Sequence, residues 1–215
     1  GKATSLLLRG AESDHVLVLI DGVKVGSATL GSFSFQDIPV EQIDRIEVVR
    51  GPRASLYGSE AIGGVIQIFT RKGDGAIKPF ARVSAGTDNT FESSAGLGGS
   101  IGRAWFSASG TASTTRGINS CSGSLVGGCF VIEPDRDGYR NRSVSLRAGY
   151  HISDTAEVQA HALTTSGFNE FDGGAFTGNQ ADVRQAIVGG KLTFSPLQPW
   201  QVTVRGGRSR DESDS

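Results

Sequence analysis

The order of strands and glycine turns between residues 16 and 70 constrains the fold of this chain most strongly. Residues 16–20 form a continuous apolar run closed by Asp21-Gly22, which is typical of a strand buried on both faces and followed by a turn. Residues 39–46 then carry apolar side chains at helical spacing, and residues 46–49 return to strand character. A second apolar strand over residues 65–69 completes a compact α+β unit.

From residue 79 onward, polar and apolar side chains alternate. In residues 143–150, Val144, Leu146, Ala148 and Tyr150 share one face, and the other face is mostly polar. The alternation predicts about seven strands. They are residues 80–86, 91–98, 104–113, 143–150, 157–162, 185–194 and 200–205. Long connections at 114–138 and 166–181 alternate with short ones, as in outer-membrane barrels. A soluble antiparallel sandwich also alternates and is the alternative.

Charge and hydropathy narrow the classes of function. The net charge is −1, so the charge balance does not indicate a nucleic-acid partner. No apolar run approaches the roughly 20 residues of a membrane helix, which excludes a helical span and leaves strands possible. The chain contains no methionine and opens on Gly1 without a signal peptide, so we expect a fragment of a longer protein.

Three features together resemble a known family. They are the motif IDGV, the segment RIEVVRGPRASLYGSEAIGGVIQIFT, and the amphipathic strands that follow. They resemble the TonB-dependent outer-membrane receptors, most closely the cobalamin-receptor branch. The resemblance implies an α+β plug followed by antiparallel transmembrane β-barrel strands, as a fragment of a roughly 22-stranded barrel. It assigns residues 1–75 to the C-terminal part of the plug and residues 76–215 to the first barrel strands.

The same resemblance implies a function. It is TonB-dependent active transport of a cobalamin across the bacterial outer membrane, with no covalent change to the ligand. No enzyme activity and no organic cofactor are therefore expected. The implied partners are TonB, engaged through a TonB box upstream of Gly1, a small-molecule ligand and outer-membrane lipid, with no nucleic acid. One alternative is a ferric-siderophore receptor of the same architecture. Another, of a different class, is a soluble calcium-dependent β-rich binding or adhesion module.

A calcium site is predicted in the longest loops. Asp135 and Asp137 precede Gly138, and carboxylates at this spacing can bend around calcium, although acidic loop pairs are usually only solvated. The resemblance implies a larger shared site that orders the outer loops. Its ligands are Asn119, Glu133, Asp135, Asp137, Phe171, Asp172 and Asp182. Asn119 replaces an acid of the branch and Phe171 replaces a tyrosine, so Phe171 is expected to bind through its backbone carbonyl.

The resemblance also places contacts in the plug. The positions that match ligand contacts of the branch are Ala3, Ser5, Glu12, Leu30 and Gly31. Ala3 and Glu12 depart from a leucine and an asparagine, so the corrinoid identity stays open. The serine- and glycine-rich loop that contains Leu30 and Gly31 could instead contact a ferric siderophore, or be a plain surface loop. Arg50 and Arg53 flank Gly51-Pro52, where the family pairs plug arginines with barrel carboxylates.

The cysteines and one histidine complete the candidates. Cys121 and Cys129 are the only cysteines, and they lie in a segment rich in glycine and serine without histidines nearby. This context favours a loop disulfide over a zinc site, and with it an oxidising compartment. His161 lies on the polar face of a predicted strand and is interpreted as solvated.

Overall fold

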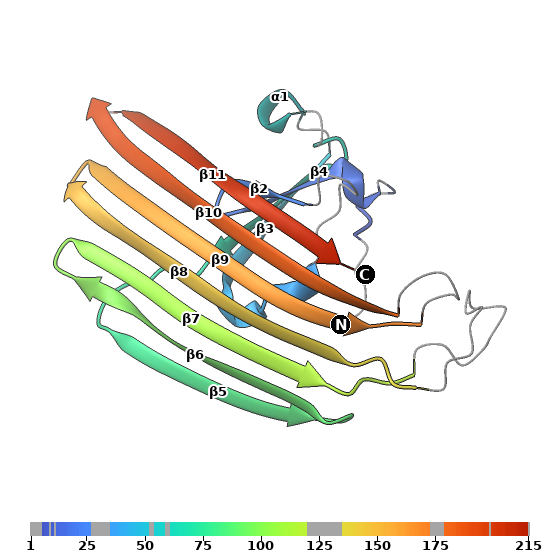
Figure 1. Cartoon of the computed structure of the whole chain (residues 1–215). Helices are drawn as coiled ribbons and strands as arrows, with labels where there is room; N and C mark the ends of the chain where they lie inside the picture. The colour runs from blue at the N-terminus through green and yellow to red at the C-terminus, as the bar shows by residue number, and fades with distance from the viewer. Residues whose placement is uncertain are drawn as a thin grey trace.

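The protein is described by a computed structural model in which two β-sheets face each other (Figure 1). The described residues are 6–8, 10, 12–26, 35–51, 54–58, 61–119, 135–172, 179–197 and 199–214. A four-stranded sheet, which we call the plug, lies behind a seven-stranded sheet, which we call the wall. Residues 71–77 connect the two. Among the described residues, no helix combines the length and the apolar character needed to span a bilayer.

The plug sheet has the order β2-β1-β4-β3. Its strands are β1 Val16–Ile20, β2 Val23–Val25, β3 Ile43–Arg50 and β4 Gly64–Thr70. β1 pairs antiparallel with β2 and parallel with β4, and all five of its residues are buried. The prediction of a doubly covered first strand is therefore confirmed. The short helical turns are η1 Ser13–His15, η2 Phe35–Asp37, η3 Val40–Gln42 and α1 Ala54–Tyr57.

The expected helical stretch over residues 39–46 is wrong. Only η3 is helical, with Gln42 N donating to Pro39 O at 3.1 Å, and β3 begins at Ile43. The apolar spacing does not mark a buried helix face, because Val40 is 70% exposed. β-Branched residues favour strands, and the ladder between β3 and β4 satisfies the backbone here.

The wall is an antiparallel meander in which each strand pairs with the next along the chain. Its strands are β5 Lys78–Gly86, β6 Thr90–Ile101, β7 Ala104–Thr115, β8 Tyr139–Ser153, β9 Ala156–Glu170, β10 Gln180–Leu197 and β11 Trp200–Asp214. The seven predicted strands are confirmed, and most extend further than predicted. We call the end that carries the long connections after β7 and β9 the outer end. The connection of β5 to β6 at this end is short, contrary to a strict alternation.

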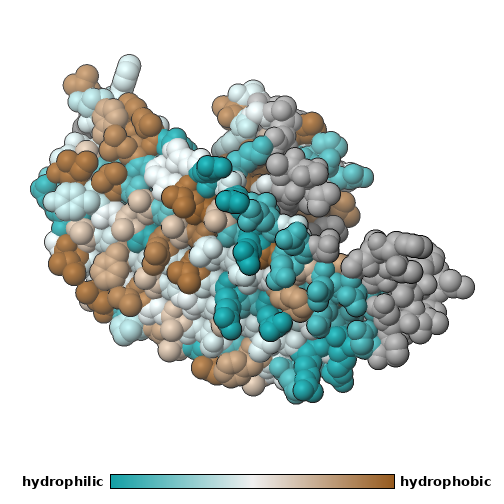
Figure 2. Space-filling model, viewed as in Figure 1, coloured by the Kyte–Doolittle hydropathy of each residue, from teal (hydrophilic) through white to brown (hydrophobic). Residues whose placement is uncertain are grey.

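The two faces of the wall differ in polarity. On β8, Asn141, Ser143 and Ser145 are buried against the plug, whereas Val144 and Leu146 are about half exposed on the opposite face. The outward face is shown in Figure 2, where hydrophobic side chains cover much of the sheet and hydrophilic ones gather toward the outer end. Apolar side chains thus point away from the protein and polar ones point inward, as expected for barrel strands around a plug.

An apolar core joins the plug to the wall. Leu163 of β9 and Ile187 of β10 are buried in the same cluster as the plug strands β1, β2 and β4. Glycines permit the close approach of β2, because a Cβ on Gly189 or Gly207 would lie 2.6 or 2.3 Å from Val23 Cγ2. The plug is therefore packed directly on the inner face of β9 to β11.

Candidate functional site: the interface between plug and wall

A buried ion pair joins the plug to the wall near the inner end. Asp21 and Gly22 form the turn between β1 and β2 with φ angles of 49° and 86°, the geometry of a two-residue hairpin turn. This turn directs the Asp21 carboxylate at β8, where Arg147 Nη1 lies 3.0 Å from Asp21 Oδ1. The side chains expose only 12% and 2% of their surface, so the pair is largely shielded from solvent.

Further hydrogen bonds extend this pair along both sheets. Thr70, the last residue of β4, donates its backbone N–H and its hydroxyl to Asp21, and its carbonyl accepts from Arg147 at 2.6 Å. Arg147 also donates to Gln159 Oε1 at 3.2 Å. One guanidinium therefore fixes the β1–β2 turn and the end of β4 against the wall.

A second group of charges adjoins the pair. Glu157 of β9 accepts a hydrogen bond from Trp105 Nε1 at 2.7 Å and lies 3.2 Å from Lys72 Nζ. Lys72 also lies 4.5 Å from the centre of the Trp105 ring, which adds a cation–π contact. Since Lys72 belongs to the connection between the sheets, this group holds the chain where it leaves the plug.

A polar cavity of about 490 Å³ is lined by both groups. We call it the Arg147 cavity. Besides the residues above, its lining includes Arg45, His161, Lys191 and Arg205. His161 is only 9% exposed, so its interpretation as a solvated histidine is wrong; the polar face of β9 points at the plug instead of bulk water.

The outer half of the interface is held by η2 and η3. Asp37 is 1% exposed, and its Oδ1 lies 3.0 Å from the Tyr139 hydroxyl. Asn141 and Thr165 donate to the Asp37 backbone carbonyl at 3.3 and 3.0 Å. Burial raises the pKa of the Asp37 carboxyl, and the hydrogen bonds from Tyr139 and Asn141 oppose this only in part. The wall therefore holds this carboxyl where its charged form is disfavoured.

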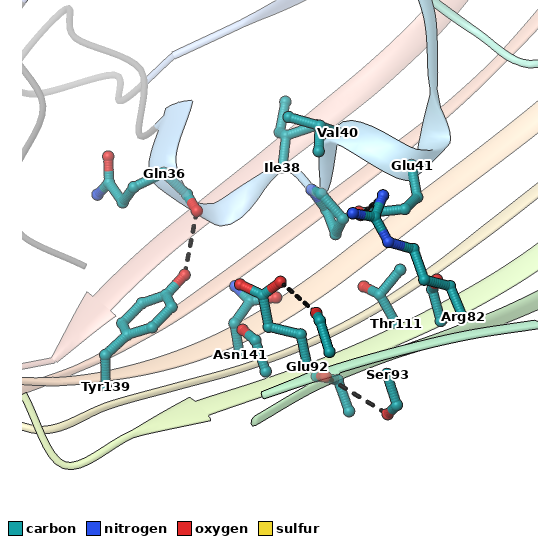
Figure 3. Close-up of a pocket in the computed structure, with 15 residues that line it drawn as sticks. Gln36, Ile38, Val40, Glu41, Arg82, Glu92, Ser93, Thr111, Tyr139 and Asn141 are labelled. Atoms are coloured by element: carbon teal, nitrogen blue, oxygen red, sulfur yellow. Dashed lines mark hydrogen bonds and ion pairs between the residues drawn. The ribbon is translucent and has the colours of Figure 1, made fainter. Parts of the chain in front are cut away.

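A smaller cavity of about 220 Å³ lies between η2, η3 and strands β5 to β8 (Figure 3). We call it the Arg82 cavity. Arg82 lies 3.7 Å from Glu41 of the plug, and Ser84 donates to Glu92 at 3.1 Å. Gln36, Thr111 and Asn141 also line it. Its polar lining can hold water or a small polar ligand between plug and wall.

The structure brings part of the predicted calcium set together through the backbone. Asp137 N donates to Ile118 O at 3.2 Å, next to Asn119, and Glu170 N donates to Gly138 O at 2.9 Å, next to Phe171. Asp137 is 6% exposed, and both carboxylate oxygens of Asp172 are shielded from solvent. Asp135 is exposed. No cluster of three metal-ligating side chains forms among the described residues.

Asp182 does not join these acids. It lies three residues into β10, opposite Phe168 and Asp214, and is exposed on the outward face. Glu12 is exposed just before η1. The other predicted positions lie outside the described residues: Ala3, Ser5, Leu30, Gly31, Arg53, Cys121, Cys129 and Glu133. The ligand contacts, the disulfide and the calcium site therefore stay predictions.

Two plug–wall ion pairs have the opposite polarity to the predicted one, whereas Lys72, where the chain leaves the plug, pairs with Glu157 of the wall. Arg50 ends β3, the plug strand furthest from β2, and its side chain is exposed. In the two reversed pairs, Asp21 and Glu41 come from the plug, and Arg147 and Arg82 come from the wall. Sequence reasoning missed these residues. One signal in the sequence could have found them: Arg147 lies among serines on the polar face of residues 143–150, the face that meets the plug.

Comparisons with known proteins agree with this architecture. Residues 1–65 match the family described as the TonB-dependent receptor plug domain. The chain is 36% identical over 215 residues to the vitamin B12 transporter BtuB of Photobacterium profundum, covering all of this chain and 32% of that protein. It is 32% identical over 231 residues to the vitamin B12 transporter BtuB of Vibrio cholerae, covering all of this chain and 37% of that protein. The chain thus spans about a third of the length of these curated relatives.

Solved structures show the same fold at lower identity. The siderophore receptor PirA from Acinetobacter baumannii matches with a TM-score of 0.75 and 18% identity, over 95% of this chain and 33% of that chain. The ferric-catecholate import receptor Fiu from E. coli K12 matches with a TM-score of 0.77 and 13% identity, over 97% of this chain and 33% of that chain. At these identities, the two structures show that the fold is shared.

Proposed function

This chain belongs to the TonB-dependent receptors, and from that premise we propose that it is part of an outer-membrane transporter that carries a cobalamin. Residues 1–75 supply the later part of its plug, and residues 76–215 supply the first strands of its barrel. The full-length protein binds the corrinoid on its outer side and is energised by TonB. The ligand passes without covalent change, so the protein is not an enzyme.

The observation that carries the proposal is the similarity across the whole chain to vitamin B12 transporters. Identities of 36% and 32% extend through the plug and all seven wall strands. The siderophore receptors, at 18% and 13% identity, share the fold alone. A ferric siderophore is therefore the second candidate ligand. The soluble calcium-dependent module is disfavoured by the apolar outward face of the wall.

The interface supports a role for the plug in gating transport. The plug shares an apolar core with the wall and is anchored by Arg147 and by the hydrogen bonds to Asp37. A polar cavity adjoins each of the two anchored points. Passage of a ligand as large as a corrinoid requires the plug to rearrange, and the Arg147 and Asp37 contacts resist that rearrangement until energy is supplied.

Calcium ordering of the outer loops is part of this proposal. Carboxylate, amide and carbonyl oxygens are the ligands that calcium prefers, and Asn119, Asp137, Phe171 and Asp172 supply them. Asp137 is 6% exposed and the carboxylate oxygens of Asp172 are shielded from solvent, so an ion bound between them would be shielded as well. A bound ion would link the connection after β7 to the connection after β9. Asp182 faces outward and is the weakest member of the set.

Direct binding to the full-length purified receptor tests the ligand class. Labelled cyanocobalamin should bind saturably, and excess ferric enterobactin should leave that binding unchanged. Displacement of the cyanocobalamin by the siderophore, or saturable binding of the siderophore alone, would favour the second candidate and contradict the first.

A further inference from the structure

The outward face of the wall changes from apolar to cationic toward its outer end. On β8, the exposed residues Val144, Leu146 and Tyr150 give way to Arg142 and Arg140. On β10, the exposed Val188 gives way to Arg184, and on β11 the exposed Val204 gives way to Arg208 and Arg210. The hydrophilic zone toward the outer end in Figure 2 is consistent with this boundary.

Strand length places this boundary at the membrane surface. A transmembrane strand needs about 9–11 residues to cross the hydrocarbon core. β8 has 15 residues and β10 has 18, so their ends extend past the core. Arg142 follows the apolar stretch of β8 toward the outer end, and it therefore lies at the level of the headgroups of the outer leaflet.

Two of these arginines, Arg142 and Arg184, lie close enough together to bind one ligand. Arg142 is opposite Ser166 of β9, which is opposite Arg184 of β10. Since neighbouring strands lie about 4.8 Å apart, the two backbones are about 10 Å apart, within reach of one ligand. Among the described residues, neither Arg142 nor Arg184 has an ion-pair partner, whereas Arg210 pairs with Glu212. Arg140 lies 4.8 Å from the centre of the Phe168 ring.

An apolar groove begins beside Arg142. It has a volume of about 640 Å³ and crosses the outward face from β5 to β9. Ala81, Val83, Ala95, Gly110 and Val144 line it, and Arg142 lies at its margin. The groove and the arginines together present a long apolar depression next to a pair of cations.

We propose that this surface binds lipid A, the phosphorylated, multiply acylated glycolipid of the outer leaflet. A phosphate group lies between Arg142 and Arg184, and one acyl chain lies in the groove over Gly110. Guanidinium groups suit this ligand because they donate two parallel hydrogen bonds to phosphate oxygens. The inference concerns the lipid-facing surface and does not depend on which ligand the receptor transports.

Native mass spectrometry of the full-length receptor tests the phosphate contact. Wild-type receptor should retain lipid A in preference to dephosphorylated lipid A and to phosphatidylglycerol. The double variant R142Q/R184Q should bind lipid A at least about tenfold more weakly than the wild type, because each surface arginine contributes measurably to binding an anionic lipid. The control R103Q alters an arginine of the opposite end, beside Asp154, and should retain lipid A like the wild type.

A second pair of variants tests the contact between the acyl chain and the groove. A Cβ on Gly110 would meet only Ser143 O, at 3.7 Å, and a Cβ on Gly206 would meet nothing within 4 Å. G110L should fill the groove and weaken lipid A binding, and G206L, on the outward face of β11, should not. Equal retention of phosphatidylglycerol and lipid A by the wild type would overturn the proposal. Undiminished lipid A binding in R142Q/R184Q or in G110L would overturn it as well.

Discussion

Arg147 in the wall lies 3.0 Å from Asp21 in the plug, and both side chains are almost removed from solvent. The pair lies beside Thr70, whose carbonyl also accepts from Arg147. The chain leaves the plug immediately after Thr70. The ion pair therefore holds the plug at the point where its last strand leads into the connection to the wall.

Removal of Arg147 should loosen this anchor. R147A leaves the Asp21 carboxylate buried without its cation, and breaking a buried pair in this way costs about 3–5 kcal/mol. Hydrogen exchange of the β4 amides in the full-length receptor should become faster, while exchange in β9 and β10 should change little. R103A is the control, because Arg103 is exposed and its loss should leave β4 exchange unchanged. Unchanged β4 exchange in R147A would show that the pair does not hold the plug.

Asp37 should make plug docking depend on pH. Burial raises its folded-state pKa above the ordinary value of 3.8, so the docked plug binds the proton more tightly than the unfolded chain. The free energy of unfolding therefore falls as the pH rises from 3.8 to the raised pKa of Asp37. Above the raised pKa, the whole of this loss of stability is present. D37N should remove this dependence and stabilise docking at neutral pH. Urea midpoints at about pH 4 and about pH 8, measured for D37N and the wild type, show the effect. D44N, at an exposed plug aspartate, is the control, and an equal pH response in D37N and wild type would contradict the assignment.

A charge on the outward face should disturb membrane insertion. Leu146 is 50% exposed on the face away from the plug, so L146R should cost roughly 2–4 kcal/mol if the residue lies near the bilayer midplane. Unfolding of the full-length receptor from lipid vesicles measures this cost. L146A separates the effect of charge from the loss of packing. If L146R were as stable as L146A, residue 146 would not face lipid.

Calcium should bind through the outer acids. Replacing Asp135 and Asp137 with alanine should abolish calcium-dependent tightening of ligand binding while leaving the barrel folded, because the oxygen ligands are lost. Calorimetric titration of calcium into the full-length receptor measures the loss. D154A, in a turn at the opposite end, should titrate like the wild type. The same calcium affinity in the double variant and in D154A would exclude the proposed site.

The sequence predicted the strands better than it predicted the interface. Val16–Ile20 and the seven wall strands follow from apolar runs and strict alternation, because each residue's face is set by the period of a strand. Which polar side chain meets which partner depends on how the plug is placed against the wall. Asp21 was interpreted only as a turn residue and His161 as solvated, since neither Arg147 nor the plug surface is near them in sequence.

The position of Arg50 in the sheet shows the same limit, and its predicted contact with a barrel carboxylate stays a prediction. Its motif was recognised from the order of residues, but the position of β3 in the sheet depends on the parallel pairing of β1 with β4. Strand order is set by long-range packing, which local patterns do not encode. The helical spacing in residues 39–46 failed for a related reason, because sheet pairing with β4 determined the backbone from Ile43 onward.

Uptake by whole cells tests the central proposal most directly. The full-length receptor would be expressed in a bacterium that lacks its own corrinoid receptor, with and without TonB, and supplied with labelled cyanocobalamin. We predict uptake in the presence of TonB and none in its absence. Uptake of a ferric siderophore without uptake of cyanocobalamin, or corrinoid uptake that is independent of TonB, would contradict the account.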